Sequence, residues 1–143
     1  MSLDLAYYKP VVGVCFAYIA LFYVFLYAQA GYVWLTFFKE KAKDPATKLA
    51  KVKYGGTPTG DKLMFDRTVG NLMEQSVPFI LSLFLSAAFG DDVQYTAQLG
   101  YFYVGVRLFY PLVFKRGLLV TLVTVPNYAA IGLLIWSVAK KML

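Results

Sequence analysis

The chain has 143 residues, of which 59% are hydrophobic, and it carries a formal net charge of +6 at pH 7. An ordinary soluble domain is about 45–50% apolar, so the composition indicates a membrane protein, and the length allows one domain. The chain has no histidine and one cysteine, Cys15. These counts exclude an intrachain disulfide, a Ser-His-Asp or Cys-His catalytic site, and a metal site built from histidines or several cysteines.

The positive charges are clustered rather than spread along the chain. No basic face interleaves with a soluble core, so we expect no nucleic-acid partner. Anionic lipid headgroups or an anionic small molecule fit these cations better. The N-terminal residues MSLDLAYYKP lack a short apolar core followed by a small-residue cleavage site, so we also expect no cleavable signal peptide.

Four apolar segments follow one another, at residues of about 11–38, 63–89, 93–114 and 118–138. The first has no charged residue, and it exceeds the roughly 20 residues that a helix needs to span a bilayer. In the last segment, Pro126 and Asn127 indicate a kink that a neighbouring helix repairs. We therefore expect an all-α membrane protein, a bundle of four transmembrane helices in a single domain over residues 1–143.

Residues 39–62 form the only long polar segment between these apolar segments. Prolines and glycines, which favour turns, interrupt it. A solvated loop is one interpretation, and a short amphipathic helix around Ala46–Val52 is another. Its seven lysines are Lys39, Lys41, Lys43, Lys48, Lys51, Lys53 and Lys62.

The cations are unequally divided between the two ends of the expected bundle. Four spans place the first and third loops on one side, where the seven lysines are joined by the cations at 115–116. The other side holds three lysines and an acidic turn at 91–92. The positive-inside rule predicts that the lysine-rich loop lies on the cytoplasmic side and that both termini lie opposite.

The second apolar segment opens with three polar residues on one face of a helix. Arg67, Asn71 and Glu74 stand at i, i+4 and i+7, and Pro78 follows at i+11. Ionisable residues inside a membrane are costly and indicate a functional site. Arginine suits anion binding because its planar fork binds carboxylates in a bidentate way.

The third segment ends with a second group of this kind. Arg107 is followed by Tyr110 and Phe114 at i+3 and i+7, and Pro111 favours a kink there. Because the second and third helices are expected to be antiparallel, this group and the polar stripe would meet at one depth, on the lysine-rich side. Lys39, at the end of the first helix, is expected at that depth too.

Three interpretations of this cluster remain open. Glu74 could neutralise Arg67 or Arg107 while Asn71 bonds a neighbouring backbone, as polar residues do between membrane helices. The arginines could instead hold an anionic small molecule between helices, with Tyr110 donating a hydrogen bond to a thiolate or oxyanion. An ion or proton path is the third interpretation, although a single carboxylate and no histidine make a sparse relay.

The pattern R-x-x-x-N-x-x-E-x-x-x-P, read from Arg67 to Pro78, resembles the second-helix signature of the MAPEG family. These are the membrane-associated proteins of eicosanoid and glutathione metabolism. The stretch RLFYPLVF, from Arg107 to Phe114, resembles the family's R-x-x-Y-x-x-x-Y. Four spans with a long polar first loop also match, so the resemblance covers nearly the whole chain in layout.

This resemblance implies a left-handed four-helix bundle that assembles as a homotrimer in the endoplasmic reticulum or another organelle membrane. Glutathione, the implied co-substrate, would bind between adjacent protomers near the cytoplasmic face. Glu74 would hold its amino group and the arginines its carboxylates, and Arg107 and Tyr110 would be the catalytic residues. The implied glutathione contacts are Lys39 (from the neighbouring protomer), Arg67, Asn71, Glu74, Arg107 and Tyr110.

The sequence departs from the family pattern at several positions. Where the family usually has Ala and then His or Gln, this chain has Thr68 and Val69. Gln75 stands for an aromatic residue, and Phe114 for the second tyrosine. The arginine that activates the thiol in leukotriene synthase has no clear match, and the nearest cations are at 115–116.

Two functions follow as hypotheses. The first is a MAPEG-like glutathione transferase or peroxidase that acts on lipophilic electrophiles or hydroperoxides from within the bilayer. The second is a catalytically silent member that binds a lipid or packs as a subunit of a larger membrane complex. Val69, Phe114 and the missing thiol-activating arginine favour the second.

Overall fold

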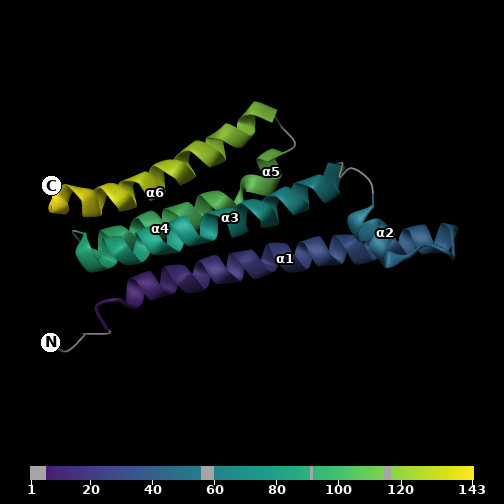
Figure 1. Ribbon diagram of the computed structural model, residues 1–143, viewed down its shortest axis with the longest axis horizontal. Coiled ribbons are helices and arrows are strands. Elements are labelled where there is room, and N and C mark those ends of the chain that lie inside the picture. The colour runs from purple at the N-terminus through teal and green to yellow at the C-terminus, as the bar shows by residue number, and fades with distance from the viewer. Residues whose placement is uncertain (1–5, 56–59, 91, 115–116) are drawn as a thin grey trace.

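The structure is a computed structural model that describes residues 6–55, 60–90, 92–114 and 117–143 (Figure 1). Every element in these ranges is helical. The elements are α1 (Lys9–Lys43), α2 (Leu49–Tyr54), α3 (Gly60–Phe89), α4 (Val93–Leu108), α5 (Tyr110–Phe114), the 3-10 helix η1 (Gly117–Val120) and α6 (Thr121–Met142).

Three helical stretches in the described residues are long and apolar enough to cross a membrane. They are Lys9–Lys43, Gly60–Phe89 and Gly117–Met142. The third expected span, 93–114, is divided at Phe109 into α4 and α5. Pro111 explains the break, because it has no N–H to continue the helix and its ring crowds the preceding turn. Alone, the 16 residues of α4 cover about 24 Å, less than the roughly 30 Å of a bilayer core.

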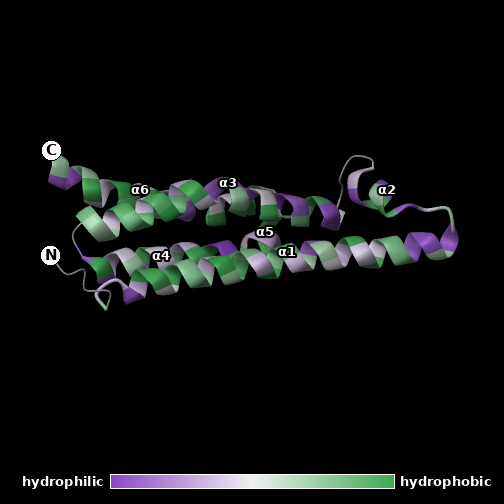
Figure 2. Cartoon of the chain, turned by 60° about the horizontal axis from the view of Figure 1, so that its bottom comes forward, coloured by the Kyte–Doolittle hydropathy of each residue, from purple (hydrophilic) through white to green (hydrophobic). Residues whose placement is uncertain are grey.

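The four longer helices pack as a bundle in which α1 and α6 each contact both α3 and α4. Each turns one stripe of side chains inward, as Val11, Val14, Tyr18 and Leu21 do on α1. The opposite faces are apolar as well, and Phe16 is 68% exposed. Figure 2 shows hydrophobic residues along most of α1, α4 and α6. Apolar residues on both sides of a helix are typical of a membrane bundle.

Buried polar contacts set the register between the helices. Near the turn between α3 and α4, the Ser86 hydroxyl lies 2.8 Å from that of Thr96 and 2.7 Å from that of Ser137. Deeper in the bundle, the rings of Phe79 and Tyr103 stack with centroids 3.9 Å apart. These contacts bind α3 to α4 at two levels and to α6 at one, and so fix the relative depth of the three helices.

The first helix continues beyond the boundary that the lysines suggested. It ends at Lys43 because Asp44, which precedes Pro45, is extended (φ −133°, ψ 102°), as residues before proline usually are. Of the two interpretations of residues 39–62, a short helix is present, but it runs over Leu49–Tyr54 (α2) rather than Ala46–Val52, and it lies beside the projecting end of α1 (Figure 1). Hydrophilic residues gather at this end of the molecule (Figure 2).

Candidate functional site

The polar stripe of α3 lies on the side of the helix that faces away from the core. Arg67 and Glu74 are exposed and Asn71 is half-buried. Their neighbours Thr68 and Val69 are 2% and 5% exposed and point into the bundle. The stripe is therefore open to whatever surrounds the single chain, either lipid or another protein molecule. Val69, a departure from the family pattern, takes no part in it.

The stripe meets the short helix α5 through one hydrogen bond. Asn71 donates from Nδ2 to the hydroxyl oxygen of Tyr110 over 2.5 Å. The break at Phe109 starts a new helix at Tyr110, and this ring is 6% exposed. Asn71 thus bonds a side chain and not the backbone that the structural interpretation of the stripe required.

Arg107 lies behind this pair, in the last turn of α4. It is 4% exposed, and its guanidinium carbon is 5.5 Å from the ring centroid of Tyr103 and 5.8 Å from that of Tyr110. Its Nε has no hydrogen-bond partner within the described ranges. Desolvated cation–π contacts contribute about 2 kcal/mol or more, which is small beside the cost of burying an isolated charge, so the guanidinium keeps an affinity for an anion.

Glu74 does not neutralise either arginine. In the part of the chain that the structure describes, no ion pair joins Glu74 to Arg67 or Arg107. The interpretation of the stripe as an internal salt bridge is therefore not supported within one chain. Arg67, Arg107 and Glu74 can therefore bind a ligand or a residue of another protein molecule.

Lys39 is not brought to this level by its own chain. Gln29 donates from Nε2 to Asp66 Oδ1 over 2.7 Å, which fixes the register of α1 against α3. Lys39 lies ten residues, or about 15 Å of helix, beyond Gln29, whereas Arg67 directly follows Asp66. The expectation of a shared depth placed the end of α1 too early.

Two buried polar residues near this level, Tyr103 and Asn127, are not predicted as site residues from the sequence. Tyr103 is fully buried and its hydroxyl has no hydrogen-bond partner among the described residues. Asn127 is also fully buried, and neither its Oδ1 nor its Nδ2 has a partner there. Tyr103 stands one helical turn before Arg107, and this spacing predicts that the two side chains share a helix face. Nothing in the apolar context of Asn127 indicates that it points inward.

The structure also shows the positions of Gln75 and Phe114, two further residues at which the sequence departs from the family pattern. Gln75 donates from Nε2 to the Tyr128 hydroxyl over 3.0 Å, which ties α3 to α6. The ring of Phe114 lies against that of Tyr110, with centroids 5.8 Å apart. The cations at 115–116, named above as the nearest to a thiol-activating arginine, lie outside the described residues.

Comparison with known families adds one result. The MAPEG family model matches residues 9–139, nearly the whole chain. The chain belongs to the MAPEG family. Comparison with curated proteins and comparison with solved structures each gave no match. For a MAPEG protein with three long apolar helices, the apolar outer surface means that the chain is an integral membrane protein.

Proposed function

We propose that this MAPEG protein binds glutathione at the α3 stripe and uses its thiol to conjugate lipophilic electrophiles or to reduce lipophilic hydroperoxides. The observation that carries the proposal is that Arg67 and Glu74 are exposed on one face and form no ion pair with any described residue, with the Asn71–Tyr110 bond between them. Glutathione carries carboxylates and an ammonium group. Charges of both signs that do not neutralise each other suit such a ligand.

Opposite charges pair each glutathione group with a side chain of the protein. Arg67 binds a glutathione carboxylate through its planar fork, and Glu74 accepts from the ammonium. Arg107, buried behind the stripe, adds a positive field where solvent screening is weak. It attracts the second carboxylate or the sulfur without needing direct contact.

The Tyr110 hydroxyl donates to no residue that the structure describes, so we assign its proton to the sulfur. Its oxygen already accepts from Asn71, so its own O–H points elsewhere. A thiol has a pKa of about 8.5, and a nearby cation or hydrogen-bond donor lowers it by favouring the thiolate. The thiolate sulfur then attacks the electrophilic carbon and forms a C–S bond, and the leaving group departs with its electron pair.

A homotrimer would complete this site. Arg67 and Glu74 face outward from their own bundle, so a neighbouring protomer can cover the bound peptide. Rotation about the membrane normal relates the protomers of such a trimer and leaves depth unchanged, so Lys39 lies about 15 Å beyond the Gln29–Asp66 level in every protomer, and we assign it no contact with glutathione. A lipophilic substrate would enter from the bilayer along the apolar outer faces of the helices.

The test compares the wild-type protein with Arg67→Ala in detergent micelles. Glutathione binding is measured by calorimetry, and turnover with 1-chloro-2,4-dinitrobenzene and with cumene hydroperoxide. We expect wild type to bind and turn over, and Arg67→Ala to lose affinity about tenfold or more, since hydrogen bonds to charged groups are worth about 1.5–3 kcal/mol. Lys62→Ala is the matched control, because Lys62 lies on the same helix but lines a cavity beside α1 and α2.

The outcomes separate the two hypotheses. A wild-type protein that binds no glutathione contradicts the proposal. One that binds glutathione but turns over neither substrate supports the catalytically silent member instead. An equal loss in Arg67→Ala and Lys62→Ala would show general electrostatic attraction rather than a site.

A further inference from the structure

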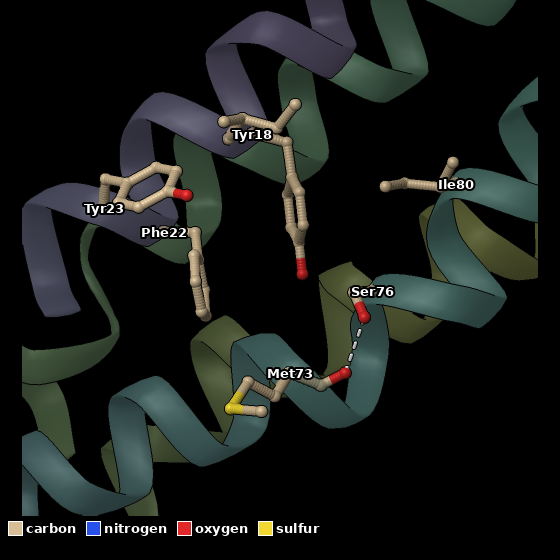
Figure 3. Close-up of a pocket in the computed structure, with 7 residues that line it drawn as sticks. Tyr18, Phe22, Tyr23, Met73, Ser76 and Ile80 are labelled. Atoms are coloured by element: carbon tan, nitrogen blue, oxygen red, sulfur yellow. Dashed lines mark hydrogen bonds between the residues drawn. The ribbon is translucent and has the colours of Figure 1, made fainter.

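A groove runs between α1 and α3 on a side of the bundle that the glutathione proposal does not use. Its deeper part is a cavity of about 430 Å³ with mainly apolar walls, among them Phe22, Met73 and Ile80 (Figure 3). Nearer the lysine-rich end lies a second cavity of about 300 Å³, where α2 covers the groove. Gln29, Lys53, Tyr54 and Asp66 supply its polar wall.

The two cavities belong to one groove because their lining residues share a helix face. On α1 the lining residues alternate by three and four, at Ile19, Phe22, Leu26, Gln29 and Val33. On α3 they recur every seven residues, at Asp66, Met73 and Ile80. Both spacings keep side chains on one side of a helix. The stripe of the glutathione proposal occupies a different face of α3.

Helix length places the polar cavity at the membrane boundary. From Lys9 to Gln29 α1 rises over twenty residues, or about 30 Å, the thickness of a bilayer core. Measured from Lys9 as one boundary, a core of this thickness ends near Gln29 and its partner Asp66. Phe22 and Met73 then lie within the hydrocarbon. The groove is charged where headgroups lie and apolar where acyl chains lie.

The polar cavity carries two opposite charges that are not joined to each other. Asp66 accepts a hydrogen bond from Gln29 at Oδ1, and no described residue forms an ion pair with it. The Lys53 ammonium lies over the Tyr54 ring, 5.0 Å from its centroid, and likewise forms no ion pair with a described residue. An anion alone would be repelled by Asp66, and a cation alone by Lys53.

We propose that this groove binds a zwitterionic phospholipid with a primary ammonium, of the phosphatidylethanolamine class. Lys53 and the Tyr54 hydroxyl bind the phosphate, and Asp66 accepts from the ammonium. One acyl chain runs along Phe22 toward Ile80. A choline headgroup satisfies Asp66 less well because its nitrogen has no hydrogen to donate, and a glycerol headgroup lacks the positive charge.

The test is native mass spectrometry of the full chain in its assembled form, delipidated and then mixed with phosphatidylethanolamine, phosphatidylcholine or phosphatidylglycerol of identical acyl chains. We expect phosphatidylethanolamine to bind most tightly. Asp66→Asn keeps the acceptor for Gln29 but removes the charge, so it should lower phosphatidylethanolamine affinity about fivefold and spare phosphatidylglycerol. Lys53→Gln should weaken all three lipids, whereas Lys51→Gln, on the same helix but lining another cavity, should weaken none.

Other results overturn the proposal. Equal binding of the three lipids, or tighter binding of phosphatidylglycerol, means that lysines alone attract headgroups. Binding of none means that a second copy of the chain or another protein covers the groove. Thermal unfolding without lipid confirms that each variant is folded, and an Ile80→Trp variant, which fills the deeper cavity, should reduce binding of all three lipids.

Discussion

Asn71 of α3 donates a hydrogen bond to the hydroxyl oxygen of Tyr110 in α5 over 2.5 Å. This contact joins the polar stripe to the helix that begins after the break at Phe109. It also orients the phenol, because an oxygen that accepts from Asn71 directs its own proton away. Within the described residues the bond is the direct link between the two motifs by which the sequence resembled its family.

Removal of this hydrogen bond should therefore reduce glutathione turnover strongly and the free energy of unfolding only modestly. We expect Tyr110→Phe and Asn71→Leu each to lower the free energy of unfolding modestly, with a coupling energy of about 1 kcal/mol in the double variant. Each should also reduce turnover with glutathione. Unfolding by sodium dodecyl sulfate titration measures the coupling. Strictly additive effects would mean that the two side chains act independently.

The meeting of these motifs was predictable, whereas the depth of Lys39 was not. In an antiparallel pair of helices, residues at equal distances from the turn lie at one level. Asn71 and Tyr110 are each about twenty residues from the turn between α3 and α4, so their approach follows from the sequence. The relation of α1 to α3 depends on a contact across 37 residues, Gln29 to Asp66, for which neither segment alone carries a signal. Hydrophobic periodicity identifies a buried face weakly when both faces of a helix are apolar.

The same reason explains why Asn127 was overlooked and Pro111 was not. Proline acts on its own backbone, so the break that separates α4 from α5 follows from one residue and its neighbours. The inward direction of Asn127 depends on the rotation of α6 against α3 and α4, and its surroundings are apolar on every side. The sequence therefore predicts the helix break at Pro111, but it does not predict the rotation of one helix against another.

Arg107→Met should remove glutathione binding without lowering the stability of the ligand-free protein. Arg107 is buried and forms no ion pair with a described carboxylate, which is energetically costly, and a hydrophobic residue of similar length often replaces a buried charge without loss of stability. We expect the melting temperature of the ligand-free protein to stay unchanged or rise, while glutathione no longer raises it. Thermal unfolding with and without millimolar glutathione measures both effects.

Arg67→Met is the control for that experiment. Arg67 is exposed, so its replacement should leave the ligand-free melting temperature unchanged and still remove the shift with glutathione. If Arg107→Met unfolds the bundle, the charge has a structural partner in the assembled protein, and the proposed role in anion binding loses its basis.

Asn127→Leu should stabilise the protein. Both polar atoms of this amide are buried without a partner in the described part of the chain, and an unsatisfied buried group costs about 1–3 kcal/mol. Leucine has a similar shape and no such cost. We expect the free energy of unfolding to increase by about 1 kcal/mol, measured by the same detergent titration.

Gln75→Leu provides the contrast. Its amide is bonded to the Tyr128 hydroxyl, so the substitution removes an existing bond between α3 and α6 and should destabilise by about 0.6 kcal/mol. Destabilisation by Asn127→Leu as well would indicate that its amide is satisfied in the membrane, by water or by another group.

Gly100 of α4 packs against Val14 of α1 and Leu83 of α3, and its lack of a side chain permits this close packing. A Cβ built there would lie 2.6 Å from Val14 Cγ1 and 2.9 Å from Leu83 Cδ1, closer than real atoms come. Gly100→Ala should therefore separate the helices and cost about 1–3 kcal/mol of unfolding free energy. Gly105, on the same helix, has nothing within 4 Å of such a Cβ, so Gly105→Ala should be neutral or stabilise by up to about 1 kcal/mol through helix propensity. Detergent titration of the two variants measures the difference, and an equal response of both would refute the close packing of α1, α3 and α4 at this point.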